Sequence, residues 1–293
     1  MDKFFTRIDE IKENEIGVKI YKNVFDINFL KELEEVHKTL LAQVDRADSK
    51  KSSFSFNENN TFKKLEKILK EFFGDFYVND FKPHFITSRF PLRIHVDSGK
   101  DPNDVIGHNI LIPINIYPHN KPVHTVIFKN RWYGPAAYFV SKKSNGRDHI
   151  FKDNNNKFID VDDVSFFNNV ILDTEDDTNI KFAGGEFLIN ELFRSEVSKL
   201  LNINRYGIRT NEHITNGKEF DKEIYKKYLS HQPYDDLRDL EIHTIYKWNL
   251  GDILTWDRSL IHSSDNFLIN GVDHKISIPI STSFIDKSFN KLD

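Results

Sequence analysis

The sequence predicts a mainly β fold, a β-sandwich or barrel, with helices that support it near the N-terminus. Two observations lead to this fold class: short runs rich in β-branched and aromatic residues recur from about residue 81, and Pro and Gly separate them. A third is that regular helical patterns are missing between most of these runs. With 293 residues, 39% of them hydrophobic, the chain can bury a core without disulfides.

The N-terminal region, residues 1–80, predicts a strand and two helices that pack on the β core. In "EIGVKIYKNVFDINFLKELEEVHKTLLAQV" the pattern favours a short strand, a turn at Asp26 to Asn28, and an amphipathic helix. The apolar positions predicted for this helix are Leu30, Leu33, Val36, Leu40 and Leu41. A second helix is predicted in "NTFKKLEKILKEFFGDF", with Gly74 as its stop. Its predicted apolar positions are Phe62, Leu65, Ile68, Leu69 and Phe72.

The β core is predicted over residues 81–293. Its first strands are expected in "FKPHFITSRF", "LRIHVD", "HNILIPINIY", "HTVIFKN" and "AAYFV", and its last in "LEIHTIYKW", "GDILTWD" and "HKISIPISTSF". Between the two groups, about residues 141–240 are interpreted as a polar insertion on the rim of the core. Its segment "EFDKEIYKKYLSHQPYDDLRDL" predicts a helix that ends near Pro233.

Composition excludes several functions. The chain has no cysteine, which rules out disulfides, Cys-ligated zinc, iron–sulfur clusters and thiol nucleophiles, so that any metal site must use His, Asp or Glu. A net charge of −4 disfavours broad attraction to nucleic acid. Neither a signal peptide nor an apolar window of membrane-spanning length is present, so we expect no membrane association and a cytoplasmic location. Nothing in the sequence fixes the oligomeric state.

The stretch "RIHVDSGK" raises the question of a metal site. In an extended strand His95 and Asp97 point to the same side, so both can bind one ion. Chance alone gives roughly one His-x-Asp pair in a chain of this composition, and the pair by itself could be two hydrogen-bonded residues at a strand end. A second stretch, "GDILTWDRSLIHSSDNF", places His262 after a strand that begins at a Gly-Asp turn and offers a third ligand.

A further strand carries a candidate anion site. In "HKISIPIST", Lys275 and Ser277 lie on one face, and a buried cation with a hydroxyl group suits a carboxylate. Arg93 and Arg258 are the alternative cations.

These motifs together resemble the iron(II)- and 2-oxoglutarate-dependent oxygenases. The resemblance lies in their order: His-x-Asp, a long gap, a His after a strand with Gly-Asp, then a basic residue, one spacer and Ser. The phrases "HNILIPINIY", "HTVIF", "WDRSLIHSSDNF" and "KISIPISTS" are similar to those of members found in phages and marine bacteria. The similarity covers about residues 81–285, interrupted by the insertion. It implies a double-stranded β-helix, two facing sheets of a jelly-roll barrel, with the insertion near its mouth.

The resemblance also implies the chemistry. His95, Asp97 and His262 would hold Fe(II), and Lys275, Ser277 and Thr125 would bind the cosubstrate 2-oxoglutarate. Reaction with O2 would release succinate and CO2 and oxidise a C–H bond of a small-molecule substrate. A retained carboxylate at the metal favours hydroxylation or a related oxidation over halogenation. Two departures from the family are the long gap before the second histidine and a lysine where arginine is commoner.

Three other readings stay open. The barrel could be a non-catalytic binding or structural protein, or a cupin-type metalloenzyme that takes no 2-oxoglutarate and needs no cation at position 275. A metallohydrolase is disfavoured because no His-Glu-x-x-His motif is present. The identity of the substrate is not determined by the sequence. Aromatic residues that could line its pocket are Trp132, Tyr133 and Tyr138.

Overall fold

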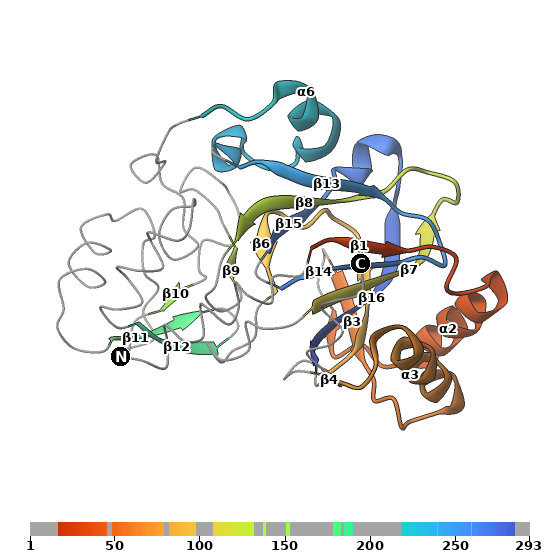
Figure 1. Ribbon diagram of the computed structural model, residues 1–293. Helices are drawn as coiled ribbons and strands as arrows, with labels where there is room; N and C mark the ends of the chain where they lie inside the picture. Colours follow the sequence, from red (N-terminus) through yellow and green to blue (C-terminus); the bar gives the residue numbers. More distant parts are fainter. Residues whose placement is uncertain are drawn as a thin grey trace.

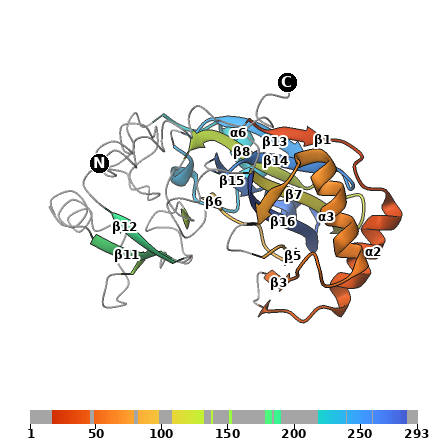
Figure 2. The same cartoon turned by 60° about the horizontal axis from the view of Figure 1, so that its bottom comes forward.

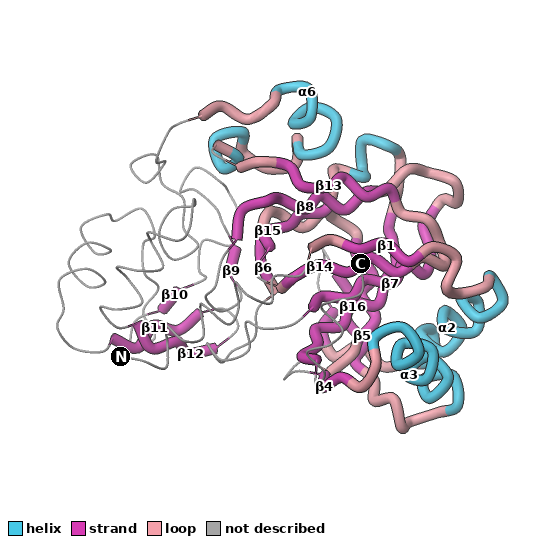
Figure 3. Tube along the Cα trace, in the orientation of Figure 1, coloured by secondary structure: helices cyan, strands magenta, loops and turns pink. Residues whose placement is uncertain are grey.

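Two antiparallel sheets face each other and form the body of the molecule (Figure 1, Figure 3). The structure is a computed structural model, and its described residues are 17–45, 49–78, 82–97, 108–131, 137–138, 151–152, 178–182, 185–189, 218–238, 240–258 and 260–284. The mainly β prediction is therefore confirmed.

The larger sheet has the strand order β1-β14-β7-β16-β5-β3-β2, and β4 also pairs with β16. Its strands are β1 (Lys19–Tyr21), β2 (Val44–Asp45), β3 (Ser49–Ser53), β4 (Phe76–Val78), β5 (His84–Ser88), β7 (His108–Tyr117), β14 (Ile253–Asp257) and β16 (His274–Phe284). Four strands of the N-terminal region, β1 to β4, thus belong to this sheet.

The smaller sheet has the strand order β13-β8-β15-β6-β9. Its strands are β6 (His95–Val96), β8 (His124–Arg131), β9 (Ala137–Tyr138), β13 (Ile242–Lys247) and β15 (Leu260–Ser264). Each of the runs in which a strand was predicted contributes at least a short strand to one of the two sheets.

The chain order of the strands identifies the fold. From β5 to β8 successive strands alternate between the larger and the smaller sheet, and from β13 to β16 they alternate again. The central orders β14-β7-β16-β5 and β13-β8-β15-β6 place every strand of one half beside strands of the other half. This interleaving is the double-stranded β-helix, a jelly roll, and it brings residues far apart in the chain onto neighbouring strands.

Two helices cover the outer face of the larger sheet (Figure 2). Helix α2 (Ile27–Thr39) begins after Asp26, whose side chain accepts a hydrogen bond from the backbone N–H of Phe29. Helix α3 (Asn60–Phe73) begins after Asn59 and ends, as predicted, at Gly74, which has φ of 67°.

Two expected core positions on these helices are wrong. Leu41 is 89% exposed, because α2 ends at Thr39 and the chain turns away before that residue. At the end of α3, Phe73 is buried, whereas Phe72 is 36% exposed on the rim of the helix pair.

The core has two parts, one on each side of the larger sheet. Strand β7 shows the division: Ile110 and Ile112 pack against the helices, whereas Leu111 faces the barrel interior. The outer part includes Leu33, Phe54, Phe62, Leu65, Phe85 and Ile278. The inner part includes Ile127, Trp248, Leu254, Trp256 and Phe267. Side chains of β16 with odd numbers, such as Lys275, therefore point into the barrel.

Part of the insertion is described. Strands β10 (Phe151–Lys152), β11 (Thr178–Phe182) and β12 (Gly185–Ile189) form a separate antiparallel sheet. The helix predicted before Pro233 does end there, but it is only α6 (Lys222–Ile224) followed by a π-helical turn (Tyr225–Leu229), and a 3-10 turn (Tyr234–Leu237) follows the proline. Among the described helices, none has the length and apolar character needed to cross a bilayer.

Candidate metal centre

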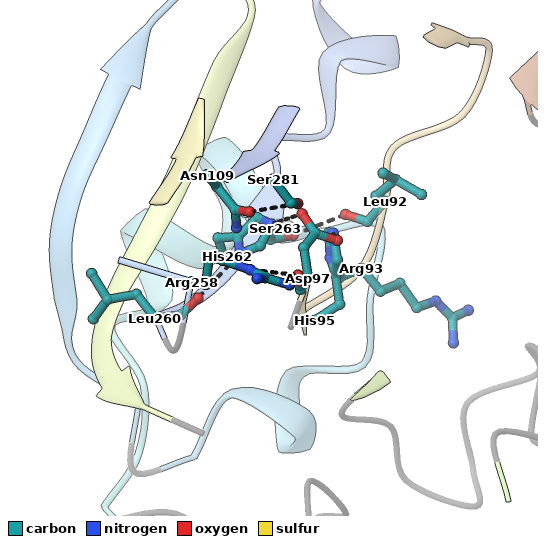
Figure 4. A network of polar contacts seen from close by, with 10 residues as sticks. All are labelled: Leu92, Arg93, His95, Asp97, Asn109, Arg258, Leu260, His262, Ser263 and Ser281. Atoms are coloured by element: carbon teal, nitrogen blue, oxygen red, sulfur yellow. Dashed lines mark hydrogen bonds and ion pairs between the residues drawn. The ribbon is translucent and has the colours of Figure 1, made fainter. Parts of the chain in front are cut away.

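The two histidines of the predicted triad lie directly opposite each other on paired strands. His95 on β6 and His262 on β15 are register partners in the smaller sheet, and their ring centroids are 4.3 Å apart. Both side chains are buried, with 7% and 4% exposed respectively. Asp97 follows β6 and points to the same side as His95 (Figure 4).

The three predicted ligands meet at one point. One ligand atom from each of His95, Asp97 and His262 lies within 4.8 Å of the others. Asp97 Oδ2 is 3.1 Å from His262 Nε2, and Asp97 Oδ1 is 3.6 Å from His95 Nε2. The Asp97 side chain is 42% exposed, so the cluster opens on one side toward ligands.

Hydrogen bonds to backbone carbonyls orient both imidazoles. His95 Nδ1 lies 2.6 Å from Arg93 O, and His262 Nδ1 lies 3.1 Å from Leu260 O. A carbonyl oxygen only accepts, so each Nδ1 carries the proton and each Nε2 presents a lone pair toward Asp97. Lone pairs of two imidazoles and a carboxylate that converge repel one another unless a cation lies between them. The donor set and its orientation therefore fit a divalent metal ion.

The electrostatics give these residues the charge states that metal ligands need. Burial, together with the neighbouring His262, lowers the pKa of His95 to about 4, so this imidazole is neutral at pH 7. The pKa of the Asp97 carboxyl lies well below its usual range although desolvation opposes its ionisation, so this carboxylate is ionised at pH 7. Neutral imidazole and ionised carboxylate are the ligand forms that bind a metal without first losing a proton.

Lys275 lies deeper in the same barrel. Its Nζ donates a hydrogen bond to Ser264 Oγ at 3.1 Å, and it sits 4.3 Å from the ring centroid of Trp248 and 4.9 Å from that of Phe267. Only 4% of Lys275 is exposed, and burial lowers its pKa to about 8, an effect that the carboxylate of Asp265 partly opposes. Ser264 follows His262 by two residues on β15, so the two side chains share the inner face.

Of the other predicted cosubstrate residues, one joins this cluster. Thr125 is the register partner of Ser264, and its Oγ1 accepts a hydrogen bond of 2.9 Å from Trp248 Nε1. Within the described ranges, the Thr125 hydroxyl donates no hydrogen bond of its own. Ser277 is buried on β16 next to Lys275 but, among the described residues, makes no side-chain hydrogen bond.

The two alternative cations, Arg258 and Arg93, contact other groups than Lys275 does. Arg258 is fully buried, and its Nε and Nη2 donate to the backbone carbonyl of Asp97 at 3.4 and 3.2 Å. It therefore holds the backbone of Asp97, the predicted carboxylate ligand, in place. Arg93 is half-buried, and its backbone carbonyl is the one that orients His95.

The remaining predicted pocket residues fall partly outside the described chain. Trp132 and Tyr133 lie outside the described residues, and for Tyr138 only the backbone is described, as the register partner of His95 in β9. His124, at the start of β8, pairs with the buried carboxylate of Asp265 at 2.8 Å.

Sequence reasoning missed a brace behind the metal centre. Gln232, 3% exposed, accepts a hydrogen bond from Ile94 N at 3.0 Å and donates from Nε2 to Ser263 Oγ at 3.4 Å. Ile94 precedes one histidine ligand and Ser263 follows the other. His231 Nε2 contacts the carbonyl of Leu92 at 3.2 Å in the same region. An isolated glutamine beside a proline gave no signal of this role.

Comparison with known proteins gives structural similarity alone. No protein-family model and no curated protein sequence matches the chain. Among solved structures, the chain is similar to the non-heme α-ketoglutarate-dependent epimerase SnoN from nogalamycin biosynthesis, with 9% identity, 96% of this chain and 83% of that chain covered, and a TM-score of 0.42.

Two further solved structures are similar over nearly the whole chain. HygX from Streptomyces hygroscopicus with nickel, 2-oxoglutarate and hygromycin B bound has 10% identity, with 96% of this chain and 87% of that chain covered and a TM-score of 0.39. A prolyl-4-hydroxylase from Pseudomonas putida has 7% identity, with 97% and 100% covered and a TM-score of 0.37. At such identities the function has to be inferred from the side chains of the site itself.

Proposed function

We propose that this chain is an iron(II)- and 2-oxoglutarate-dependent dioxygenase that hydroxylates, or otherwise oxidises, a small molecule. The observation that carries the proposal is the convergence of His95, Asp97 and His262 inside a double-stranded β-helix. Two imidazoles and one carboxylate form a facial set that leaves adjacent positions of an octahedral ion open to ligands, and this donor set is typical of non-heme iron(II) oxygenases.

The place of Lys275 supports 2-oxoglutarate as the cosubstrate. Its partner Ser264 is two residues beyond His262, which along a strand is about 7 Å. That distance is of the order of the length of an extended dicarboxylate. A ligand that binds the metal through one end can therefore place its other carboxylate against the ammonium group and the hydroxyl of Thr125.

The surroundings of Lys275 strengthen this contact. The ammonium lies between the rings of Trp248 and Phe267, where water is excluded and an ionic hydrogen bond is stronger than at a surface. In the absence of a guanidinium fork, the hydroxyl groups of Thr125 and Ser264 supply the additional directional contacts.

The protein residues have distinct tasks in the proposed reaction. The triad holds the metal, Lys275 and Thr125 orient the cosubstrate, and the exposed side of Asp97 leaves space for the substrate. Bound iron(II) would supply the activation of O2 for the overall reaction 2-oxoglutarate + O2 + R–H → succinate + CO2 + R–OH. The barrel covers the imidazole side of the site, where His95 and His262 are buried.

The test is production of succinate by the full chain supplied with iron(II), 2-oxoglutarate, ascorbate and O2. We expect succinate and CO2 in equal amounts, and loss of both in His262→Ala and Asp97→Ala. The matched controls are His243→Ala and Asp75→Ala, which change exposed residues and should leave turnover intact.

The alternatives give different results in the same assay. Tight metal binding without 2-oxoglutarate turnover would favour a cupin-type metalloenzyme. Absence of both in folded protein would favour a non-catalytic barrel. An iron-dependent activity that survives in Lys275→Met would remove the cosubstrate from the proposal while leaving the metal site in place.

A further inference from the structure

Two buried N–H donors lie beside the metal centre with no acceptor. Asn109 on β7 and Trp256 on β14 are each 3% exposed, and within the described chain Asn109 Nδ2 and Trp256 Nε1 make no hydrogen bond. They are register partners on adjacent strands of the larger sheet, so their side chains leave the same face side by side.

Both side chains are held next to a metal ligand. The ring of Trp256 contacts that of His262 edge to face, with centroids 4.8 Å apart. Ser281 Oγ donates a hydrogen bond of 3.0 Å to Asn109 Oδ1, which fixes the amide and leaves its NH2 group facing elsewhere. Figure 4 shows Asn109 and Ser281 beside His262 and Asp97.

An unsatisfied donor in a protein interior is unfavourable, and two on adjacent positions are rare. A ligand that brings an acceptor-only oxygen removes the penalty for both. The group that needs such donors most is a carboxylate. When one of its oxygens binds a metal, the other oxygen still requires hydrogen-bond donors.

This acceptor is not the carboxylate that Lys275 would hold. Along β16, Ser281 is six residues from Lys275, which corresponds to about 20 Å. The contacts instead run from Lys275 to Ser264, along β15 to His262, and from there to Trp256. The two donors therefore lie near His262, at the end of the barrel that holds the predicted metal site, and not near Lys275.

We propose that Asn109 Nδ2 and Trp256 Nε1 form a donor pair that receives the free oxygen of a carboxylate bound at the metal. The proposal deepens the function proposed above and rests on it for the identity of the carboxylate, the 1-carboxylate of 2-oxoglutarate. The pair would fix the orientation of that carboxylate relative to His262 and Asp97.

The experiment uses the full chain loaded with nickel(II), with which no oxidation of the cosubstrate takes place. The binding of two probes to this protein is measured by calorimetric titration. The first probe is 2-oxoglutarate. The second is oxalate, which also binds a metal through a carboxylate but is too short to reach Lys275. The variants are Asn109→Asp, which replaces the donor by an acceptor of the same shape, and Trp256→Phe, which keeps the ring against His262 and removes the N–H.

We expect both variants to bind both probes at least about ten-fold more weakly, with nickel(II) affinity unchanged. Asn57→Asp, which adds the same charge at an exposed position before α3, is the matched control and should bind like the unmodified chain. Lys275→Met should weaken 2-oxoglutarate but not oxalate. Unchanged affinity for both probes in Asn109→Asp and Trp256→Phe overturns the donor pair.

The failure of this inference can be told apart from failure of the proposed function. If the unmodified chain binds oxalate but not 2-oxoglutarate, the proposed cosubstrate is wrong, while the oxalate titrations still decide whether the donor pair exists. If Asn109→Asp does not fold, as judged by circular dichroism, Trp256→Phe gives the answer alone.

Discussion

Gln232 Oε1 accepts a hydrogen bond of 3.0 Å from the backbone N–H of Ile94, the residue before the predicted metal ligand His95. The other end of the same amide contacts Ser263, the residue after the second histidine ligand. One side chain from the end of the insertion thus ties together the two strands whose separation sets the distance between the imidazoles. Groups that orient metal ligands in this way contribute strongly to metal affinity.

The first prediction concerns this brace. Gln232→Ala should weaken nickel(II) or iron(II) binding by about ten- to hundred-fold, because the β6 segment loses its anchor while the ligands themselves stay. Calorimetric titration with the metal measures it. Gln43→Ala, at an exposed position, is the control. Equal metal affinity in both variants would show that strand pairing alone holds the two histidines.

The second prediction concerns pH. Because burial lowers the pKa of Lys275 to about 8, the ammonium loses its proton as the pH rises through that value, and the site loses the cation that attracts a carboxylate. Affinity for 2-oxoglutarate should fall by up to about ten-fold per pH unit above pH 8. Calorimetry of the nickel(II)-loaded chain between pH 7 and about pH 9 measures it.

The matched variant is Lys275→Arg. A guanidinium stays protonated over this range, so its 2-oxoglutarate affinity should be flat where that of the unmodified chain declines. The same decline in both proteins would place the titrating group elsewhere.

The third prediction concerns stability in acid. His37 of α2 stacks on Phe85, with centroids 4.6 Å apart, and its Nε2 lies 2.9 Å from Thr87 Oγ1. Burial, reinforced by Lys50 and partly opposed by Glu34, lowers its pKa to about 4.

Since the unfolded chain takes up this proton near pH 6.5, stability is complete above that pH and falls as the pH drops toward 4. The loss is at most about 1.4 kcal/mol per pH unit for this one group. In His37→Gln the loss from this group is absent, so the gap in unfolding free energy between the two proteins should narrow from pH 7 to pH 5. Urea denaturation at both values measures it, and a constant gap would contradict the assignment.

The fourth prediction is that a substitution in the outer core lowers stability without changing metal affinity. Leu65 of α3 is fully buried between the helices and the larger sheet, and Leu65→Ala should cost about 2–5 kcal/mol of unfolding free energy. Leu41→Ala, at a side chain that is 89% exposed, should cost almost nothing. Because the helices lie on the opposite face of the sheet from the barrel, metal affinity in folded Leu65→Ala should equal that of the unmodified chain.

Local patterns predicted the helices and strands well. The periodicity of apolar residues and the residues that cap helices both act over a few positions of the sequence. Gly74 marked a helix end that the structure confirms, whereas α2 begins at Ile27, within the turn predicted at Asp26 to Asn28. The errors occur where the end of a helix decides burial, as at Leu41 and Phe72. The tight π-helical turn before Pro233 has no local signature that distinguishes it from an ordinary helix.

The sequence by itself determined which chemical groups are available. It excluded cysteine from any metal site, placed His95 and Asp97 on the same side of a strand, and placed Lys275 and Ser277 on one face of the C-terminal strand. Tertiary structure alone decided that His262 comes to Asp97 across 165 positions of chain, and that Ser264 rather than Ser277 is the partner of Lys275. The physical reason is that periodicity fixes only the face on which a side chain lies. Which faces meet depends on the pairing of strands from the two halves of the barrel, and that register is set by packing over the whole fold.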